Sequence, residues 1–132
     1  MSPRKQERIF APQYAGELLL IAEGDLFSAI AISEHKEARL ENAFYMVQQS
    51  IEKAIKAVLV KKGLPVPMVH DLGVLIAKLP SDLTPPFGYE LSDLNQYAAI
   101  RRYEIGQFKL DHEEFTLVLE KCREILAWCV SQ

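Results

Sequence analysis

The sequence predicts an all-α protein, an up-and-down bundle of four to five helices. Two observations predict this fold class. Almost every segment places its apolar residues at helical spacing, and no segment alternates apolar and polar residues between hairpin turns. The chain of 132 residues, 49% hydrophobic and 25% charged, suits one domain with a substantial core. No linker divides it, so we expect residues 1–132 to form a single domain, with residues 1–12 as a flexible N-terminal tail.

The first two predicted helices are long. Residues 14–33 carry one apolar face, which is made of Leu18, Ile21, Ala22, Leu26, Ala29 and Ile30. Residues 37–62 carry a longer apolar face, which is made of Leu40, Ala43, Phe44, Val47, Ile51, Ala54, Ile55, Val58 and Leu59. The segment 63–67 (GLPVP) ends the second helix, because glycine and proline are typical of helix C-termini.

A short third helix is predicted over residues 71–79. Asp71 is its N-cap, and Pro80 cannot continue it. The segment 80–88 holds three prolines and is therefore interpreted as a loop.

Two further helices are predicted over residues 90–103 and 111–130. The last one contains both cysteines, Cys122 and Cys129. Seven helical positions correspond to about 10.5 Å of rise, which is too far for a disulfide. Both cysteines share the apolar face and have no nearby ligand residues that would complete a zinc site. We therefore expect two buried thiols and no metal site.

Composition and missing motifs exclude several classes of function. A net charge of −3 is unlike a polybasic nucleic-acid coat, although a local basic patch remains compatible with it. No apolar run approaches the roughly 18 residues of a membrane span, and the N-terminus lacks the apolar core of a secretory signal. We expect a cytoplasmic protein that does not bind membranes. Phosphate-binding glycine loops, HExxH and GxSxG are all absent, and no cofactor is expected.

The most informative polar residues lie on the second predicted helix. One row at i, i+4, i+8 is Gln48, Glu52 and Lys56, and the neighbouring row is Tyr45, Gln49 and Lys53. Spacing alone favours a solvated helix face, with Glu52 and Lys56 as an ordinary stabilising pair. A surface that binds phosphate or a partner is the alternative.

Three other polar features have both a structural and a functional interpretation. His70 precedes a helix N-terminus, where it could pack or could hydrogen-bond a ligand. Arg102 and Tyr103 follow the fourth helix, where a guanidinium could complement the helix dipole or grip a phosphate. His112, near the start of the last helix, is interpreted as a solvated side chain.

The second helix resembles the central helix of HEPN domains (higher-eukaryote and prokaryote nucleotide-binding). The resemblance rests on residues 41–59 (ENAFYMVQQSIEKAIKAVL), on His70-Asp-Leu72, on Tyr97, and on Arg102-Tyr103. The alanine- and acid-rich first helix is also similar, so the likeness extends from about residue 18 to residue 130. The run QQxxEKxxK followed by HDL is fairly specific.

This resemblance implies a bundle of four to five helices that is usually a homodimer. Small prokaryotic members are often encoded beside a minimal nucleotidyltransferase, and many such pairs act as toxin and antitoxin. Other members are metal-independent endoribonucleases that carry an Arg-x(4–6)-His motif, with a composite site at the dimer interface. Their His and Arg would assist attack by a 2′-hydroxyl and stabilise phosphate charge.

This sequence lacks the ribonuclease motif. The required window after Arg101 or Arg102 is 106–109, and it holds no histidine, while His112 lies ten residues after Arg102. The leading hypothesis is therefore a non-catalytic HEPN protein that binds a nucleotide or RNA phosphate, or docks a minimal nucleotidyltransferase. A divergent ribonuclease toxin using Arg102 with His70 or His112 is the alternative, and a purely structural dimerisation module is the third hypothesis.

The leading hypothesis assigns a role to each residue of the expected ligand-binding set. That set is Glu52, Lys53, Lys56, His70, Arg102 and Tyr103. The two lysines and Arg102 are expected to meet phosphate charge, Tyr103 to stack on a base, and Glu52 to orient Arg102.

Overall fold

The computed structural model describes residues 6–100 and 110–132. Its main elements are α1 (Tyr14–Glu34), α2 (Leu40–Lys61), α3 (Leu72–Ala77), the 3₁₀ helix η1 (Gly88–Asn95), α4 (Gln96–Ile100) and α5 (His112–Ser131). Two-residue strands β1 (Glu7–Arg8) and β2 (Val66–Pro67) form the only sheet among the described residues. The all-α prediction is confirmed. None of the helices within the described ranges is long and apolar enough to cross a bilayer.

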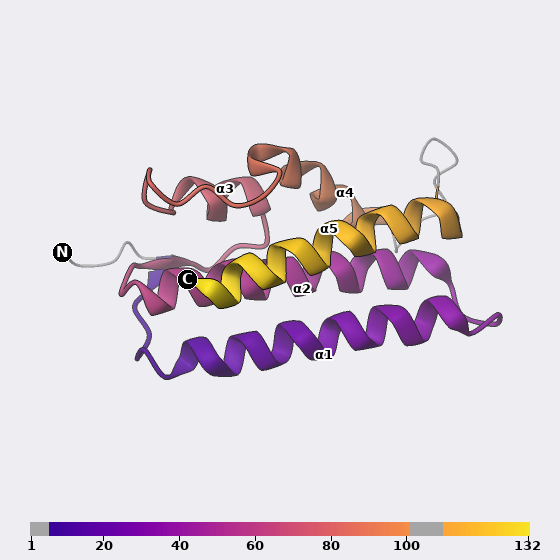
Figure 1. Cartoon of the computed structure of the whole chain (residues 1–132), viewed down its shortest axis with the longest axis horizontal. Coiled ribbons are helices and arrows are strands. Elements are labelled where there is room, and N and C mark those ends of the chain that lie inside the picture. Colours follow the sequence, from indigo (N-terminus) through magenta and orange to yellow (C-terminus); the bar gives the residue numbers. More distant parts are fainter. Residues whose placement is uncertain (1–5, 101–109) are drawn as a thin grey trace.

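Helix α2 is the central element of the bundle. Both α1 and α5 pack against it, and α1 makes few contacts with α5. Figure 1 shows α1 and α5 running along α2, with α3 and α4 on the opposite side of α2 from α1. Because other elements surround α2, most of its residues from Ala43 to Val60 are buried.

The chain passes along the bundle four times. Helices α2 and α5 run in the same direction, and the segment from α3 through η1 to α4 carries the chain back between them (Figure 1). The third passage is therefore built from three short helical pieces. An aromatic cluster joins this passage to its neighbours, since Phe44 lies 4.8 Å from Tyr97 and 5.4 Å from Phe115 between ring centroids.

The C-terminus of α2 is formed as the sequence predicts. Gly63 adopts a left-handed conformation with φ of 71°. The Gly63 N–H donates to the Val60 carbonyl, and the Leu64 N–H donates to the Leu59 carbonyl, both at 3.0 Å. This pattern is a Schellman motif, which satisfies helix-end carbonyls and suits a residue without a Cβ.

The structure describes residues 6–12 of the segment for which the sequence predicts a flexible tail. In this part Glu7 pairs with Pro67 and Arg8 with Val66. Phe10 also stacks on Tyr14 at 4.8 Å. A two-residue strand gives no detectable alternation in sequence, so this pairing depends on the tertiary contact with the loop after α2.

The fourth predicted helix, over residues 90–103, begins as a 3₁₀ helix and becomes α-helical only at Gln96. Side chains there bond to the backbone instead of pointing to solvent. The Ser92 hydroxyl donates to the Tyr89 carbonyl at 2.7 Å, and the Asn95 side-chain oxygen accepts from the Leu72 N–H at 2.9 Å. Such bonds compete with a regular helix. Residues 101–103 of this prediction lie outside the described residues.

The interpretation of the cysteines as core residues is confirmed. Cys122 and Cys129 are both free and buried. Burial raises the pKa of the Cys122 thiol to about 11 and that of Cys129 to about 12. A thiol held protonated in this way is a poor nucleophile.

Candidate functional site

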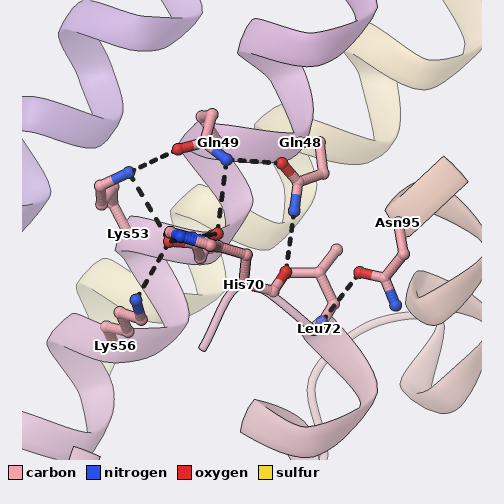
Figure 2. Close-up of polar contacts among 8 residues, drawn as sticks. Gln48, Gln49, Lys53, Lys56, His70, Leu72 and Asn95 are labelled. Atoms are coloured by element: carbon pink, nitrogen blue, oxygen red, sulfur yellow. Dashed lines mark hydrogen bonds and ion pairs between the residues drawn. The ribbon is translucent and has the colours of Figure 1, made fainter. Parts of the chain in front are cut away.

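A cluster of polar side chains lies where the middle of α2 meets the residue that leads into α3. We call it the Glu52 cluster, and its members are Gln48, Gln49, Glu52, Lys53, Lys56 and His70. Figure 2 shows the side chains of Lys53, Lys56 and His70 converging on one point beside α2. Five members come from neighbouring rows of a single helix, and the sixth is supplied by the chain that returns over it.

Glu52 is the centre of the cluster. Its side chain is 0% exposed, and its oxygens face nitrogen atoms of four side chains. Lys56 Nζ lies 3.0 Å from Oε2, and His70 Nδ1 lies 3.0 Å from Oε1. Lys53 Nζ is 3.7 Å from Oε2, and Gln49 Nε2 is 3.4 Å from Oε1. A buried carboxylate is costly unless paired and hydrogen-bonded in this manner.

The solvated helix face favoured by spacing is wrong for the row at i, i+4, i+8. Gln48 and Glu52 are 0% exposed and Lys56 is 8% exposed. Because α2 is central, α3 and the residues before it cover this row. The spacing of these residues along α2 does not show that other segments of the chain cover them.

The two lysines have different surroundings. Lys56 is nearly buried, and its ammonium group is committed to Glu52 at 3.0 Å. The Lys53 side chain is 24% exposed and donates to Gln49 Oε1 at 2.9 Å. Lys53 is therefore the lysine of the cluster that can reach a ligand from solvent, while Lys56 neutralises the buried carboxylate.

His70 is anchored on one side and open on the other. Gln48 Nε2 donates to the His70 carbonyl at 3.1 Å, and Gln49 Nε2 donates to Gln48 Oε1 at 2.7 Å. The imidazole Nδ1 faces Glu52, whose carboxylate only accepts hydrogen bonds, so Nδ1 carries a proton. The His70 side chain is 76% exposed, which leaves Nε2 available to solvent.

The start of α3 is held in place by a second set of polar contacts. Asp71 caps the helix by accepting from the Val74 N–H at 3.2 Å, as the sequence predicts. Asn95 accepts from the Leu72 N–H at 2.9 Å and donates to Asp71 Oδ1 at 3.1 Å (Figure 2 shows the contact with Leu72). These bonds fix the backbone directly after His70 and thereby orient its side chain.

Asp25 is a residue of this region that the sequence analysis did not select. Burial raises the pKa of its carboxyl, Lys53 opposes that shift, and Glu52 adds to it. Asp25 on α1 therefore lies in the electrostatic field of the cluster. Its spacing within α1 gives no such signal, because the contact joins two helices.

Other predicted site residues are not brought to this cluster. His112 is exposed in the first turn of α5, the turn before Phe115, whose ring contacts Phe44. Phe44 lies eight residues before Glu52 on α2, which is about 12 Å of helical rise. The structure therefore separates His112 from His70. Arg102 and Tyr103, together with the prediction that Glu52 orients Arg102, lie outside the described residues.

The arrangement favours an anion over a metal as a ligand. Within residues 6–100 and 110–132, no group of three or more His, Cys, Asp or Glu side chains could hold a metal ion. The solvent-facing members of the cluster are the ammonium group of Lys53, which donates hydrogen bonds to oxyanions, and the imidazole of His70, whose Nε2 donates to an oxyanion when both ring nitrogens carry protons. The negative charge that these two groups offset is that of Glu52, whose side chain is buried.

The fold and the cluster together define a helical-bundle protein with one histidine and two lysines arranged around a buried carboxylate. The family model for the HEPN domain matches residues 15–132, and the chain belongs to the HEPN family. Among solved structures, the crystal structure of TT1696 from Thermus thermophilus is similar, with a TM-score of 0.69 and 22% identity. The match covers 89% of this chain and 96% of that one, and at this identity it shows the shared fold. No curated protein matches the chain at a significant level.

Proposed function

We propose that the protein is a non-catalytic HEPN protein that binds the phosphate group of a nucleotide or RNA at the Glu52 cluster. The observation that carries the proposal is the orientation of Lys53 and His70 by a buried carboxylate. Both side chains are accessible, and both are held by neighbours that are themselves buried. Donors fixed in advance bind a ligand with less loss of side-chain entropy.

The residues of the Glu52 cluster have different proposed roles. Lys53 supplies positive charge, and His70 Nε2 accepts or donates a hydrogen bond according to its protonation. Glu52 and Lys56, which are buried, position the side chains of Lys53 and His70. Arg102 and Tyr103 remain the proposed phosphate and base contacts. We further propose a cytoplasmic homodimer that acts in a toxin–antitoxin-like pair with a minimal nucleotidyltransferase.

The test is a titration of the purified protein with ATP and with a short single-stranded RNA, at several salt concentrations. Lys53→Gln and His70→Gln are each expected to weaken binding about tenfold, the size of one charge-assisted hydrogen bond. Lys62→Gln is the matched control, because it removes the same charge from an exposed position at the end of α2. Equal affinities for the wild type, Lys53→Gln and His70→Gln would reject phosphate binding at this cluster. A pull-down with a nucleotidyltransferase would then test docking as the function.

The contact between His70 and Glu52 also favours a second candidate, the divergent ribonuclease. A carboxylate that holds Nδ1–H leaves Nε2 as a general base within reach of solvent. A substrate 2′-hydroxyl would give its proton to Nε2 as its oxygen bonds to phosphorus. The bond between phosphorus and the 5′-oxygen would break, and the 5′-oxygen would take a proton from water.

Incubation of labelled total RNA with the protein in the absence of metal separates the two candidates. The phosphate-binding proposal predicts no cleavage. Cleavage that is lost in both His70→Ala and Arg102→Ala would establish the nuclease instead. A folded dimer with neither binding nor cleavage would leave the structural module as the function.

A further inference from the structure

A small polar cavity lies between η1, α4 and α5, where Figure 1 shows α4 beside the first turns of α5. It shares no residue with the Glu52 cluster. Its volume is about 240 Å³, which is below the roughly 300–1,000 Å³ of sites for drug-sized ligands. Six of its lining residues are charged or aromatic, namely Phe87, Glu90, Asp93, Tyr97, Glu114 and Lys121.

The charge around this cavity is negative. Glu90, Asp93 and Glu114 are acidic, and Lys121 is the basic residue among the described side chains that line it. In the described part of the chain, none of the three carboxylates forms an ion pair. Three carboxylates and one ammonium group leave two excess negative charges. A cation that enters the cavity therefore gains a Coulomb attraction that the chain does not satisfy by itself.

The phenol of Tyr97 lies in this negative field. Its ring packs on Phe44 with 4.8 Å between centroids, and the residue is 4% exposed. Burial is the main reason why the pKa of the Tyr97 phenol is raised to about 12, the charges of Glu114 and Asp93 add to the shift, and a hydrogen bond from Gln96 opposes it. Charges that disfavour a phenolate favour a cation at the same place. The phenol stays neutral, and its oxygen can accept a hydrogen bond from that cation.

An ammonium group of the chain itself lies against the aromatic wall of the cavity. Lys121 Nζ is 5.4 Å from the centroid of the Phe87 ring, which is within the range of about 6 Å for a cation–π contact. Lys121 is exposed on α5, so its side chain can move out into solvent. The contact shows which chemistry this wall attracts, and the ammonium group of a ligand can replace that of Lys121.

The carboxylates are spread around the cavity instead of converging on one point. In the part of the chain that the structure describes, no three acidic, histidine or cysteine side chains could hold a metal ion. Separate carboxylates of this kind suit an extended organic cation, whose ammonium groups donate charge-assisted hydrogen bonds. At about 30 Å³ per water molecule, the cavity has the volume of roughly eight waters. This is enough room for a chain of four carbons with an amino group at each end.

We propose that the cavity between η1, α4 and α5 binds a small alkyl diamine. One ammonium group of the diamine lies on the Phe87 ring in place of Lys121. The other donates hydrogen bonds to the carboxylates of Asp93 and Glu114 and to the Tyr97 oxygen. The two charges of the diamine match the two excess negative charges of the lining residues. This proposal is independent of phosphate binding, because the cavity and the Glu52 cluster have no residue in common.

The first test is a calorimetric titration of the full chain with diaminobutane, in a buffer without primary amines. Butylamine has the same carbon chain with one charge and should bind about tenfold more weakly, and uncharged butanediol should not bind. Glu114→Gln should weaken diamine binding about tenfold, and glutamine suits this position in the first turn of a helix. Glu113→Gln is the matched control, because Glu113 is the adjacent exposed acid of α5 and does not line the cavity. A diamine that binds no better than butylamine, or equal affinities for wild type and Glu114→Gln, would overturn the proposal.

The second test depends on the direction of the effect at Lys121. Lys121→Gln should strengthen diamine binding about three- to tenfold, because it removes the ammonium group that the ligand displaces. Lys62→Gln removes the same charge from the end of α2, outside the cavity, and should leave the affinity unchanged. Unchanged or weaker binding by Lys121→Gln would contradict a ligand ammonium group on the Phe87 ring.

A titration with acetyl-lysine amide distinguishes a free diamine from a lysine side chain of a partner protein. This compound carries one ammonium group on the same four-carbon chain, so it should bind as weakly as butylamine. Tighter binding of acetyl-lysine amide than of diaminobutane would overturn the diamine as the ligand. Phosphate affinity should be equal in wild type and Glu114→Gln, so diamine binding and phosphate binding at the Glu52 cluster are measured separately.

Discussion

Neutralising the buried carboxylate of Glu52 should destabilise the protein far more than neutralising an exposed one. In Glu52→Gln, the ammonium group of Lys56 keeps its position at about 11% side-chain exposure but loses its counter-charge at 3.0 Å. Breaking a buried ion pair by removing one partner costs about 3–5 kcal/mol. We expect a loss near 3 kcal/mol, because the side-chain oxygen of the glutamine can still accept part of the hydrogen bonds that Gln49, Lys56 and His70 make to Glu52.

Urea unfolding followed by circular dichroism measures this loss. With a slope of about 2 kcal/mol per molar urea, the midpoint should fall by about 1.5 M. Glu41→Gln is the control on the same helix. Its pair with Arg39 has the same 3.0 Å separation, but the side chains are 28% and 50% exposed. Such a pair is worth under about 1 kcal/mol.

A double variant tests the physical reason for the loss. Glu52→Gln combined with Lys56→Met removes both buried charges, so the second change should restore much of the stability lost by the first. Equal losses for Glu52→Gln and Glu41→Gln would refute the role of Glu52 as the centre of the cluster. Strictly additive effects in the double variant would refute the explanation by an unpaired buried charge.

Three further predictions concern other parts of the molecule. Asp25→Asn should strengthen phosphate binding about two- to fivefold in a titration, because it removes a negative charge next to the cluster. An unchanged affinity would show that the charge of Asp25 does not act on a ligand at the Glu52 cluster. Alkaline pH should destabilise the protein through Cys122 and Cys129. Their pKa values are raised by burial from 9.0 to about 11 and about 12, so their stabilisation is full below pH 9 and is lost between pH 9 and 12, as unfolded thiols release protons first. The melting temperature should fall over that interval, and the fall should be smaller when both are alanine. Asn95→Ala should cost about 1–3 kcal/mol, because it leaves the Leu72 N–H unpaired, and hydrogen exchange should accelerate in α3 before it does in α2.

The helices that the sequence predicted well are the ones whose apolar spacing is long and uninterrupted. The prediction of residues 14–33 corresponds to α1, and that of residues 37–62 contains α2. Both agree because six turns of regular spacing leave one structure that buries the apolar residues. The prediction for residues 90–103 was less accurate, because side chains such as Asn95 bond to a distant segment of backbone. The hydrogen bond from the Leu72 N–H to Asn95 joins two distant segments, so it leaves no pattern in the sequence around Asn95.

The candidate site was also predicted only in part from the sequence. Glu52, Lys53 and Lys56 were predicted together, because positions three and four apart on a helix are neighbours. His70 joins them only because the chain after α2 turns back over that helix, where Gln48 holds its carbonyl.

The sequence by itself determined the all-α class, the bounds of the long helices, the helix caps and the buried cysteines. These features depend on interactions between residues a few positions apart, which the order of amino acids states directly. Only the tertiary structure decided that α2 is central, that the row containing Glu52 is buried, and that Asp25 on α1 faces the cluster. Those outcomes depend on which helix faces are covered by segments far away in the chain. A helical period gives the direction of a side chain around its own axis, but it does not say what lies in that direction.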